Sequence, residues 1–158
     1  MKLLSASPQR LVFRLSQLER DWLIAVLNRY PVVPESHSTL TRGGDAALRE
    51  HEPLLREALA EQRNTLRERI RNWLATPGRW RSTEFGYRLV VPRDDVEWLL
   101  QALNDVRVGC WLRLGAPEEL PREPEKLPPE RQMDYSLMEV GGAFQMTLIE
   151  ALDEADSP

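Results

Sequence analysis

A chain of 158 residues, 42% of them hydrophobic, is long enough for one domain and apolar enough for one core. The net charge is −4, and no run approaches the roughly 20 apolar residues that a membrane span needs. The start, MKLLSASP, is too short for the core of a signal peptide, and the single cysteine, Cys110, excludes an intramolecular disulfide. We expect one helical domain over 1–158, located in the reducing cytoplasm and away from membranes.

The charge is distributed unevenly along the chain. Residues 1–61 carry eight basic and eight acidic side chains and are neutral. Residues 62–93 carry eight arginines against two glutamates, a net charge of +6, and residues 94–158 carry five basic against fifteen acidic side chains, a net charge of −10. The basic middle and the acidic final third therefore either neutralise each other in the fold or face different partners.

The N-terminal part predicts a strand followed by a helix. Apolar and other side chains alternate over 10–15, which is typical of a strand with one buried face. Ser16 and Glu19 have the spacing of a capping box, so we expect a helix over 17–29. That helix is apolar nearly all round, which indicates a central position or a subunit interface. The prolines in 31–44 predict a loop.

The middle of the chain predicts a long helix and a second strand. A helical pattern runs from Asp45 to residue 75, with a kink or a break near residue 52 because Pro53 lacks an amide hydrogen. Alternation returns over 84–91, which predicts a strand. Because a lone strand leaves its backbone groups unsatisfied, we expect 10–15 and 84–91 to pair with each other.

The last third predicts two helices, over 96–114 and 133–153, separated by a loop rich in proline and glutamate over 116–132. The expected fold is mainly α (α+β), with four to five helices around one core and a small two-stranded antiparallel sheet. Apolar side chains exceed one stripe on the first and last helices, which favours a homodimer.

Arg107 lies within the predicted apolar stripe of helix 96–114, among Val106, Cys110 and Trp111. A buried guanidinium needs an acidic partner or several carbonyl oxygens. Two interpretations remain open: a buried ion pair that sets helix register, or an arginine that lines a pocket for an anionic ligand or for the carboxylate of a partner.

Four arginines form a stripe on the long helix, within roughly 80° of one another: Arg56, Arg63, Arg67 and Arg71. Like charges at this spacing weaken an isolated helix by a few tenths of a kcal/mol per pair. The stripe is either solvated, neutralised by the acidic final third, or bound to the phosphates of nucleic acid with support from Arg79, Arg81 and Arg88.

Catalytic and metal-binding patterns are not recognisable. His37, His51 and Cys110 do not have zinc-ligand spacing, and Arg42-Gly43-Gly44-Asp45 is a short turn rather than a phosphate loop. Asp94 and Asp95 precede a helix, where acids usually serve as capping groups. We expect no catalytic residues, no metal and no cofactor.

The segment from Asp95 to Gly115, which contains WLLQALNDVRVGCWLRLG, together with DYSLMEVGGAFQMTLIEAL over 134–152, resembles a bacterial family of unknown function that is typically encoded beside the Clp protease adaptor ClpS. The resemblance implies a small, helical, non-enzymatic and regulatory protein. Some relatives are described as oxidative-stress regulators that use a cysteine pair, a switch that one cysteine cannot form.

Three functions follow from these observations. The first is a non-catalytic interaction or regulatory protein with a protein partner. The second is a nucleic-acid-associated transcriptional regulator that uses the arginine-rich helix face. The third is a small-anion binder or an enzyme at Arg107.

Overall fold

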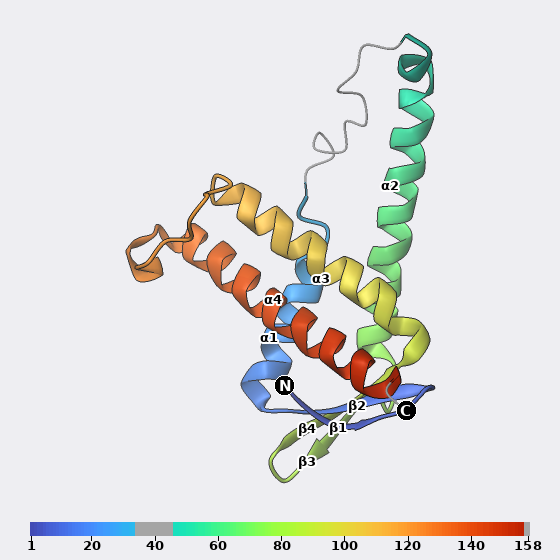
Figure 1. Cartoon of the computed structure of the whole chain (residues 1–158), viewed down its shortest axis with the longest axis vertical. Helices are drawn as coiled ribbons and strands as arrows, with labels where there is room; N and C mark the ends of the chain where they lie inside the picture. Colours follow the sequence, from blue (N-terminus) through green and yellow to red (C-terminus); the bar gives the residue numbers. More distant parts are fainter. Residues whose placement is uncertain (34–45, 157–158) are drawn as a thin grey trace.

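The computed structural model describes residues 1–33 and 46–156, apart from the side chains of residues 46–52. In the described chain four helices stand above a small antiparallel sheet (Figure 1). Of the residues that the structure describes, 64% are helical, so the prediction of a mainly α fold with a small sheet is confirmed. The predicted loop over 31–44 lies mostly outside the described residues.

The sheet has four strands in the described part, so the prediction of two was wrong. The neighbours are all antiparallel and lie in the spatial order β1-β2-β4-β3, where the strands are β1 (Lys2–Ala6), β2 (Arg10–Leu15), β3 (Trp80–Thr83) and β4 (Gly86–Pro92). The predicted pairing of the two longer strands forms the centre. The outer strands β1 (KLLSA) and β3 (WRST) show no clear alternation of apolar and polar residues, which is why the sequence did not predict them. Their backbone hydrogen bonds come from pairing with the central strands β2 and β4.

One face of the sheet is buried under the helices. Alternate side chains of β2 and β4 enter the core and are at most 1% exposed: Leu11, Phe13, Leu15, Leu89 and Val91. Because side chains on a strand alternate between the two faces, Arg10, Arg14 and Arg88 belong to the opposite, outer face.

The first two helices begin and continue largely as their sequences predict. At the start of α1 (Gln17–Arg29), Ser16 Oγ accepts a hydrogen bond from the Glu19 amide and the Glu19 carboxylate accepts one from the Ser16 amide. The predicted capping box is thus confirmed. The second helix, α2 (Ala46–Ala75), continues through Pro53, so the chain does not break near residue 52. It extends well beyond the other helices (Figure 1).

The last two long helices, α3 (Arg93–Arg113) and α4 (Pro129–Asp156), lie side by side and are both longer than predicted. Between them the predicted loop contains a short 3-10 turn, η2 (Pro124–Lys126). Gly115 follows α3 with a φ of 97°, the left-handed conformation that ends a helix.

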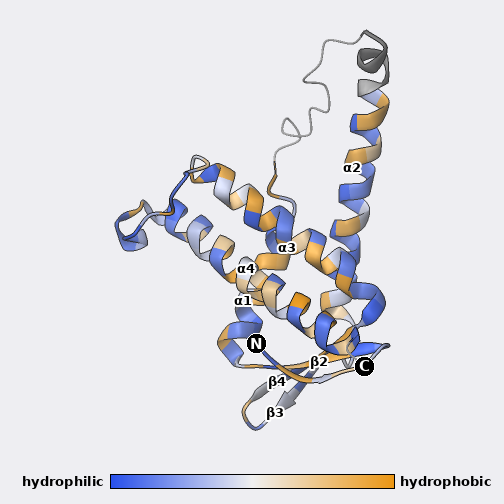
Figure 2. Ribbon diagram, viewed as in Figure 1, coloured by the Kyte–Doolittle hydropathy of each residue, from blue (hydrophilic) through white to orange (hydrophobic). Residues whose placement is uncertain are grey.

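The buried side chains of the described residues form one cluster where α1, α3 and α4 meet above the sheet. Figure 2 shows the apolar residues gathered there, while α2 carries hydrophilic residues over much of its length. Of the described side chains of α2, Ile70 and Trp73 belong to the core and Leu66 and Leu74 pack against it, all of them near the C-terminal end of the helix. The position of α2 therefore depends on a few contacts near that end.

At that end of α2, the carboxylate of Asp95 on α3 makes several polar contacts. It accepts hydrogen bonds from Trp73 Nε1 and Trp98 Nε1, both at 3.0 Å, and from Arg69 Nη2 at 3.2 Å. Arg79 Nη2 lies 3.6 Å from the same carboxylate. Asp95 therefore connects α2, and Arg79 just before β3, to α3. The sequence predicted only a helix-capping role for this residue.

Candidate functional site

Arg107 is exposed, so the prediction that it is buried in the apolar face of its helix was wrong. Its Nη2 donates to Asn104 Oδ1 at 2.9 Å, one turn back on α3. The buried face of α3 includes Trp98, Ala102 and Gly109, which shifts it away from Arg107 and Trp111. The neighbouring helices, strands and the segment after α1 select this sector, and the periodicity of α3 alone does not distinguish it.

Arg107 borders a groove between α3, α4 and the loop that follows α3. The groove has a volume of about 740 Å³, and its lining includes Trp111, Leu120 and Met146, which are 37%, 40% and 57% exposed. Two acids, Glu118 and Glu139, line the same groove. The groove is therefore apolar with charges of both signs at its edge.

The four arginines of the stripe on α2 do not share one environment. Arg67 and Arg71 line a second cavity, whereas Arg63 is half-buried beside Tyr30. Arg56 is exposed and does not line this cavity. Among the described ion pairs, none joins Arg63, Arg67 or Arg71 to the acidic final third of the chain.

The second cavity lies between the C-terminal end of α1, α2 and the end of α3, with a volume of about 670 Å³. Four arginines from three helices line it: Arg29, Arg67, Arg71 and Arg113. Sequence reasoning found the two on α2, because they share a helix face, and missed the other two. Each of those stands in the last turn of its helix, a position that basic residues often occupy for the helix dipole.

Asp134 of α4 lies behind this cavity and is the buried acid that the acidic final third contributes, at 3% exposure. Its carboxylate lies 3.3 Å from Arg113 Nε and 3.9 Å from Arg29 Nη2. Cys110 Sγ donates to the same carboxylate at 3.9 Å. Burial, with the charge of Asp134, raises the pKa of the Cys110 thiol to about 11, so Cys110 is protonated at neutral pH.

The segment that follows α1 forms one wall of this cavity, and hydrogen bonds from this segment to α3 hold it in place. Asp105 Oδ1 accepts hydrogen bonds from the amides of Val32, at 2.6 Å, and Val33, at 3.3 Å. Gly109 allows this approach, because a Cβ there would lie 2.5 Å from Val32 Cβ. Burial and the Asp105 charge raise the pKa of the Tyr30 hydroxyl, while the positive charges of Arg63 and Arg67 oppose that rise.

The outer face of the sheet carries a third charged surface. Lys2 lies opposite Arg14, Arg14 opposite Arg88, and Arg88 opposite Arg81, so one row crosses all four strands. Directly opposed residues share a face, and Arg10 lines a shallow pocket there with Arg81 and Arg88. We call Lys2, Arg10, Arg14, Arg81 and Arg88 the cationic sheet face.

All five side chains of the cationic sheet face are exposed, and none has an ion pair with a residue that the structure describes. The sequence grouped Arg79 with Arg81 and Arg88, but Arg79 faces inward, where its Nη1 donates to the Val90 carbonyl at 3.0 Å. Lys2, Arg10 and Arg14 were missed, because their isolated positions acquire meaning only through strand register.

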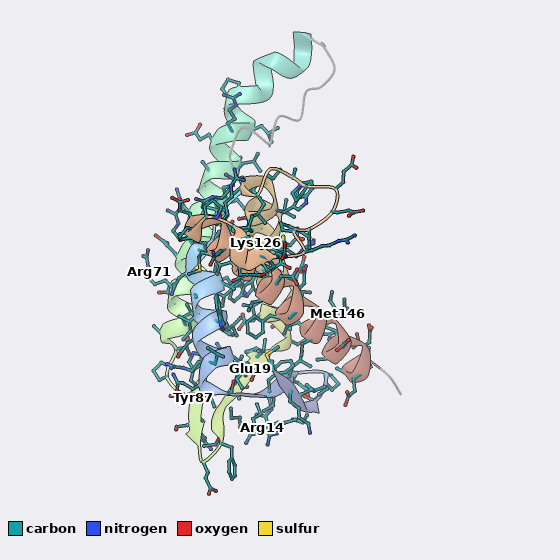
Figure 3. The ribbon with its side chains drawn as sticks, turned by 90° about the vertical axis from the view of Figure 1, so that its left-hand side faces the viewer. Arg14, Glu19, Arg71, Tyr87, Lys126 and Met146 are labelled. Carbon is teal, nitrogen blue, oxygen red and sulfur yellow. The ribbon has the colours of Figure 1, made fainter. Side chains whose placement is uncertain are left out.

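The three surfaces are well separated. In Figure 3, Arg71 on α2, Arg14 on the sheet and Met146 on α4 lie on different parts of the molecule. In residues 1–33 and 46–156, no three His, Cys, Asp or Glu side chains are grouped as metal ligands. Within these described ranges, no helix is long and apolar enough to cross a bilayer.

Comparison with protein families identifies the class to which the chain belongs. A family model described as a domain of unknown function, DUF2017, matches residues 42–152, which is well over half of the chain. The chain therefore belongs to this family, and the expected membership of a family of unknown function is confirmed. Comparisons with curated proteins and with solved structures find no match.

Proposed function

We propose that this protein is a non-catalytic regulatory binding module, and that the cationic sheet face binds the phosphate backbone of nucleic acid. The row of like charges across four strands carries this proposal. Directly opposed like charges destabilise a sheet, and the row contains three such pairs in succession. A polyanion on this face would offset that cost, because no described carboxylate forms an ion pair with these five side chains. Glu19 lines a pocket with Lys2 and Arg14, but its carboxylate pairs with the N-terminal amine.

The geometry also suits a backbone contact. Neighbouring strands are about 4.8 Å apart, so the row spans about 14 Å, enough to follow several phosphates. The face is a sheet surface, and not the arginine stripe of α2 that the sequence offered as one possible contact with nucleic acid. We also propose that the protein is located in the cytoplasm. The family resemblance further suggests a bacterial source and a gene that lies beside the gene for ClpS.

Salt dependence of nucleic-acid binding tests the proposal. Fluorescence anisotropy with a labelled 20-base-pair duplex would give the affinity at several salt concentrations. If all five cations neutralise phosphates, the plot of log K against log salt has a slope of about −4.5. Replacing Arg14 and Arg88 with alanine is expected to reduce the magnitude of this slope by about 1.8.

The matched control is the Arg67→Ala/Arg71→Ala variant, which removes the same charge from α2. It is expected to keep the slope of the wild-type protein. Binding that does not change with salt, no binding at low salt, or an equal change in both variants would contradict the proposal.

A second candidate function is self-association through the groove between α3 and α4, and we propose a second copy of this chain as its occupant. Exposed apolar side chains at Trp111, Leu120 and Met146 support an interface there. Arg107 and Glu139 at the edge of the groove have opposite charges. In a two-fold dimer every contact occurs twice, so a pair between Arg107 of one copy and Glu139 of the other would form on both sides of the axis.

Sedimentation velocity tests this second function. The wild-type protein is expected to form dimers at micromolar concentration, and Met146→Glu is expected to be monomeric. Leu18→Glu is the control, because Leu18 is 66% exposed on α1 and does not line the groove. A monomeric wild-type protein, or equal effects of both substitutions, would argue against the dimer.

A further inference from the structure

The cavity between α1, α2 and α3 has a charge that its surroundings do not balance. Four guanidinium groups line it, and among the described residues its lining contains no carboxylate: the other described lining residues are Leu27, Asn28, Tyr30, Pro31, Val32 and Ile70. The one described acid that pairs with any of the four is Asp134, which contacts Arg29 and Arg113. One carboxylate against four cations leaves an excess of about three positive charges.

Two of the four arginines are held in place and two are available. Asp134 fixes Arg29 and Arg113 from behind the cavity, at 3% exposure. Arg67 and Arg71 are exposed, one turn apart on α2, and have no ion pair with a described residue. This arrangement places preoriented guanidinium groups opposite free ones, with open space between them.

The remaining described lining consists of one polar residue, Asn28, and five apolar or aromatic residues. Leu27 and Ile70 are nearly fully buried, at 1% and 3% exposure, so the apolar wall that a ligand can reach is formed by the half-buried Pro31 and Val32. Val32 is tied to α3 through Asp105. Tyr30 adds an aromatic ring to the same lining. The cavity therefore combines a cationic rim with an apolar wall that a ring system could contact.

We propose that this cavity binds a small organic phosphate of nucleotide size that carries at least two negative charges. Guanidinium groups bind phosphate oxygens in a bidentate manner, and all four cations of the described lining are arginines. A volume of about 670 Å³ lies in the range of sites for small ligands, and the apolar wall accepts the base. The site is separate from the cationic sheet face, so it does not depend on nucleic-acid binding there.

Isothermal titration calorimetry with ATP, tripolyphosphate and citrate as probes tests this site. ATP is expected to bind with a dissociation constant below about 1 mM, more tightly than tripolyphosphate because only ATP carries a base for the apolar wall. Citrate, which has three carboxylates and no phosphate, is expected to bind most weakly.

The variant Arg67→Ala/Arg71→Ala is expected to weaken ATP binding by about 10- to 100-fold. Both side chains are exposed, so the variant should fold, which circular dichroism would verify. Arg81→Ala/Arg88→Ala removes equal charge from the sheet and is expected to leave ATP binding unchanged. No saturable binding of ATP, equal losses in both variants, or preferential binding of citrate would overturn the proposal.

Discussion

Replacing Asp95 with alanine is expected to loosen the attachment of α2 to the rest of the fold. The carboxylate accepts two indole hydrogen bonds at 3.0 Å, from Trp73 on α2 and Trp98 on α3. It also pairs with Arg69 at 3.2 Å and with Arg79 at 3.6 Å. The Arg79 side chain is only 12% exposed, and burial lowers the pKa of its guanidinium while the charge of Asp95 opposes that change.

The magnitude follows from the groups left without a partner. Each buried indole N–H that loses its acceptor costs about 1–3 kcal/mol, and breaking a buried ion pair costs about 3–5 kcal/mol. These contributions belong to one network and do not add in full, so we expect a loss of about 4 kcal/mol. That is a large part of the roughly 5–15 kcal/mol by which a domain is stable.

Equilibrium denaturation in guanidinium chloride, followed by circular dichroism at the helix band, would measure this loss. Asp94→Ala is the matched control, because Asp94 is the neighbouring acid, is exposed, and lies in the same first turn of α3. We expect it to cost about 1 kcal/mol or less, from the helix dipole alone. A loss below about 1.5 kcal/mol for Asp95→Ala, or losses of equal size, would refute the argument.

Three further results are expected. Arg107→Ala should change the free energy of unfolding by less than about 1 kcal/mol, because the side chain is exposed; a loss of several kcal/mol in denaturation would contradict this. Gly109→Ala should destabilise the fold by about 2 kcal/mol, because its Cβ would lie 2.5 Å from Val32 Cβ. Gly142→Ala should be neutral or stabilising by up to about 1 kcal/mol, because its Cβ would lie 3.6 Å from Arg107 Cδ. Equal melting temperatures of the two variants would argue against this difference. Burial raises the pKa of the Cys110 thiol from 9.0 to about 11, so its contribution to stability is complete below pH 9 and is lost as the pH rises towards 11. Over this range the free energy of unfolding of the wild-type protein should fall by about 2–3 kcal/mol more than that of Cys110→Ala. Parallel losses in the two proteins would be inconsistent with the raised pKa.

Local chemistry in the sequence determines much of the secondary structure. The capping box at Ser16 and Glu19 sets the start of α1, and alternation over 10–15 and 84–91 indicates the two central strands of the sheet. Such signals are readable because they depend on residues close together in the chain. The outer strands β1 and β3 were not predicted, since short segments with little alternation become strands only when a central strand pairs with them.

The surfaces that could bind a partner depend on tertiary structure. The periodicity of α3 defines an apolar half but not which sector the neighbouring elements cover, so Arg107 was wrongly placed inside. Likewise, the α2 stripe places Arg67 and Arg71 together, but packing of three helices brings Arg29 and Arg113 to them.

The cationic sheet face has the same origin. Lys2, Arg14, Arg88 and Arg81 are far apart in the chain and show no common motif, and antiparallel register alone aligns them. The sequence by itself therefore determined the class of fold, the helices and the central strands, because these depend on local spacing. Tertiary structure decided which charges converge, because convergence depends on helix packing and strand register, which no local pattern records.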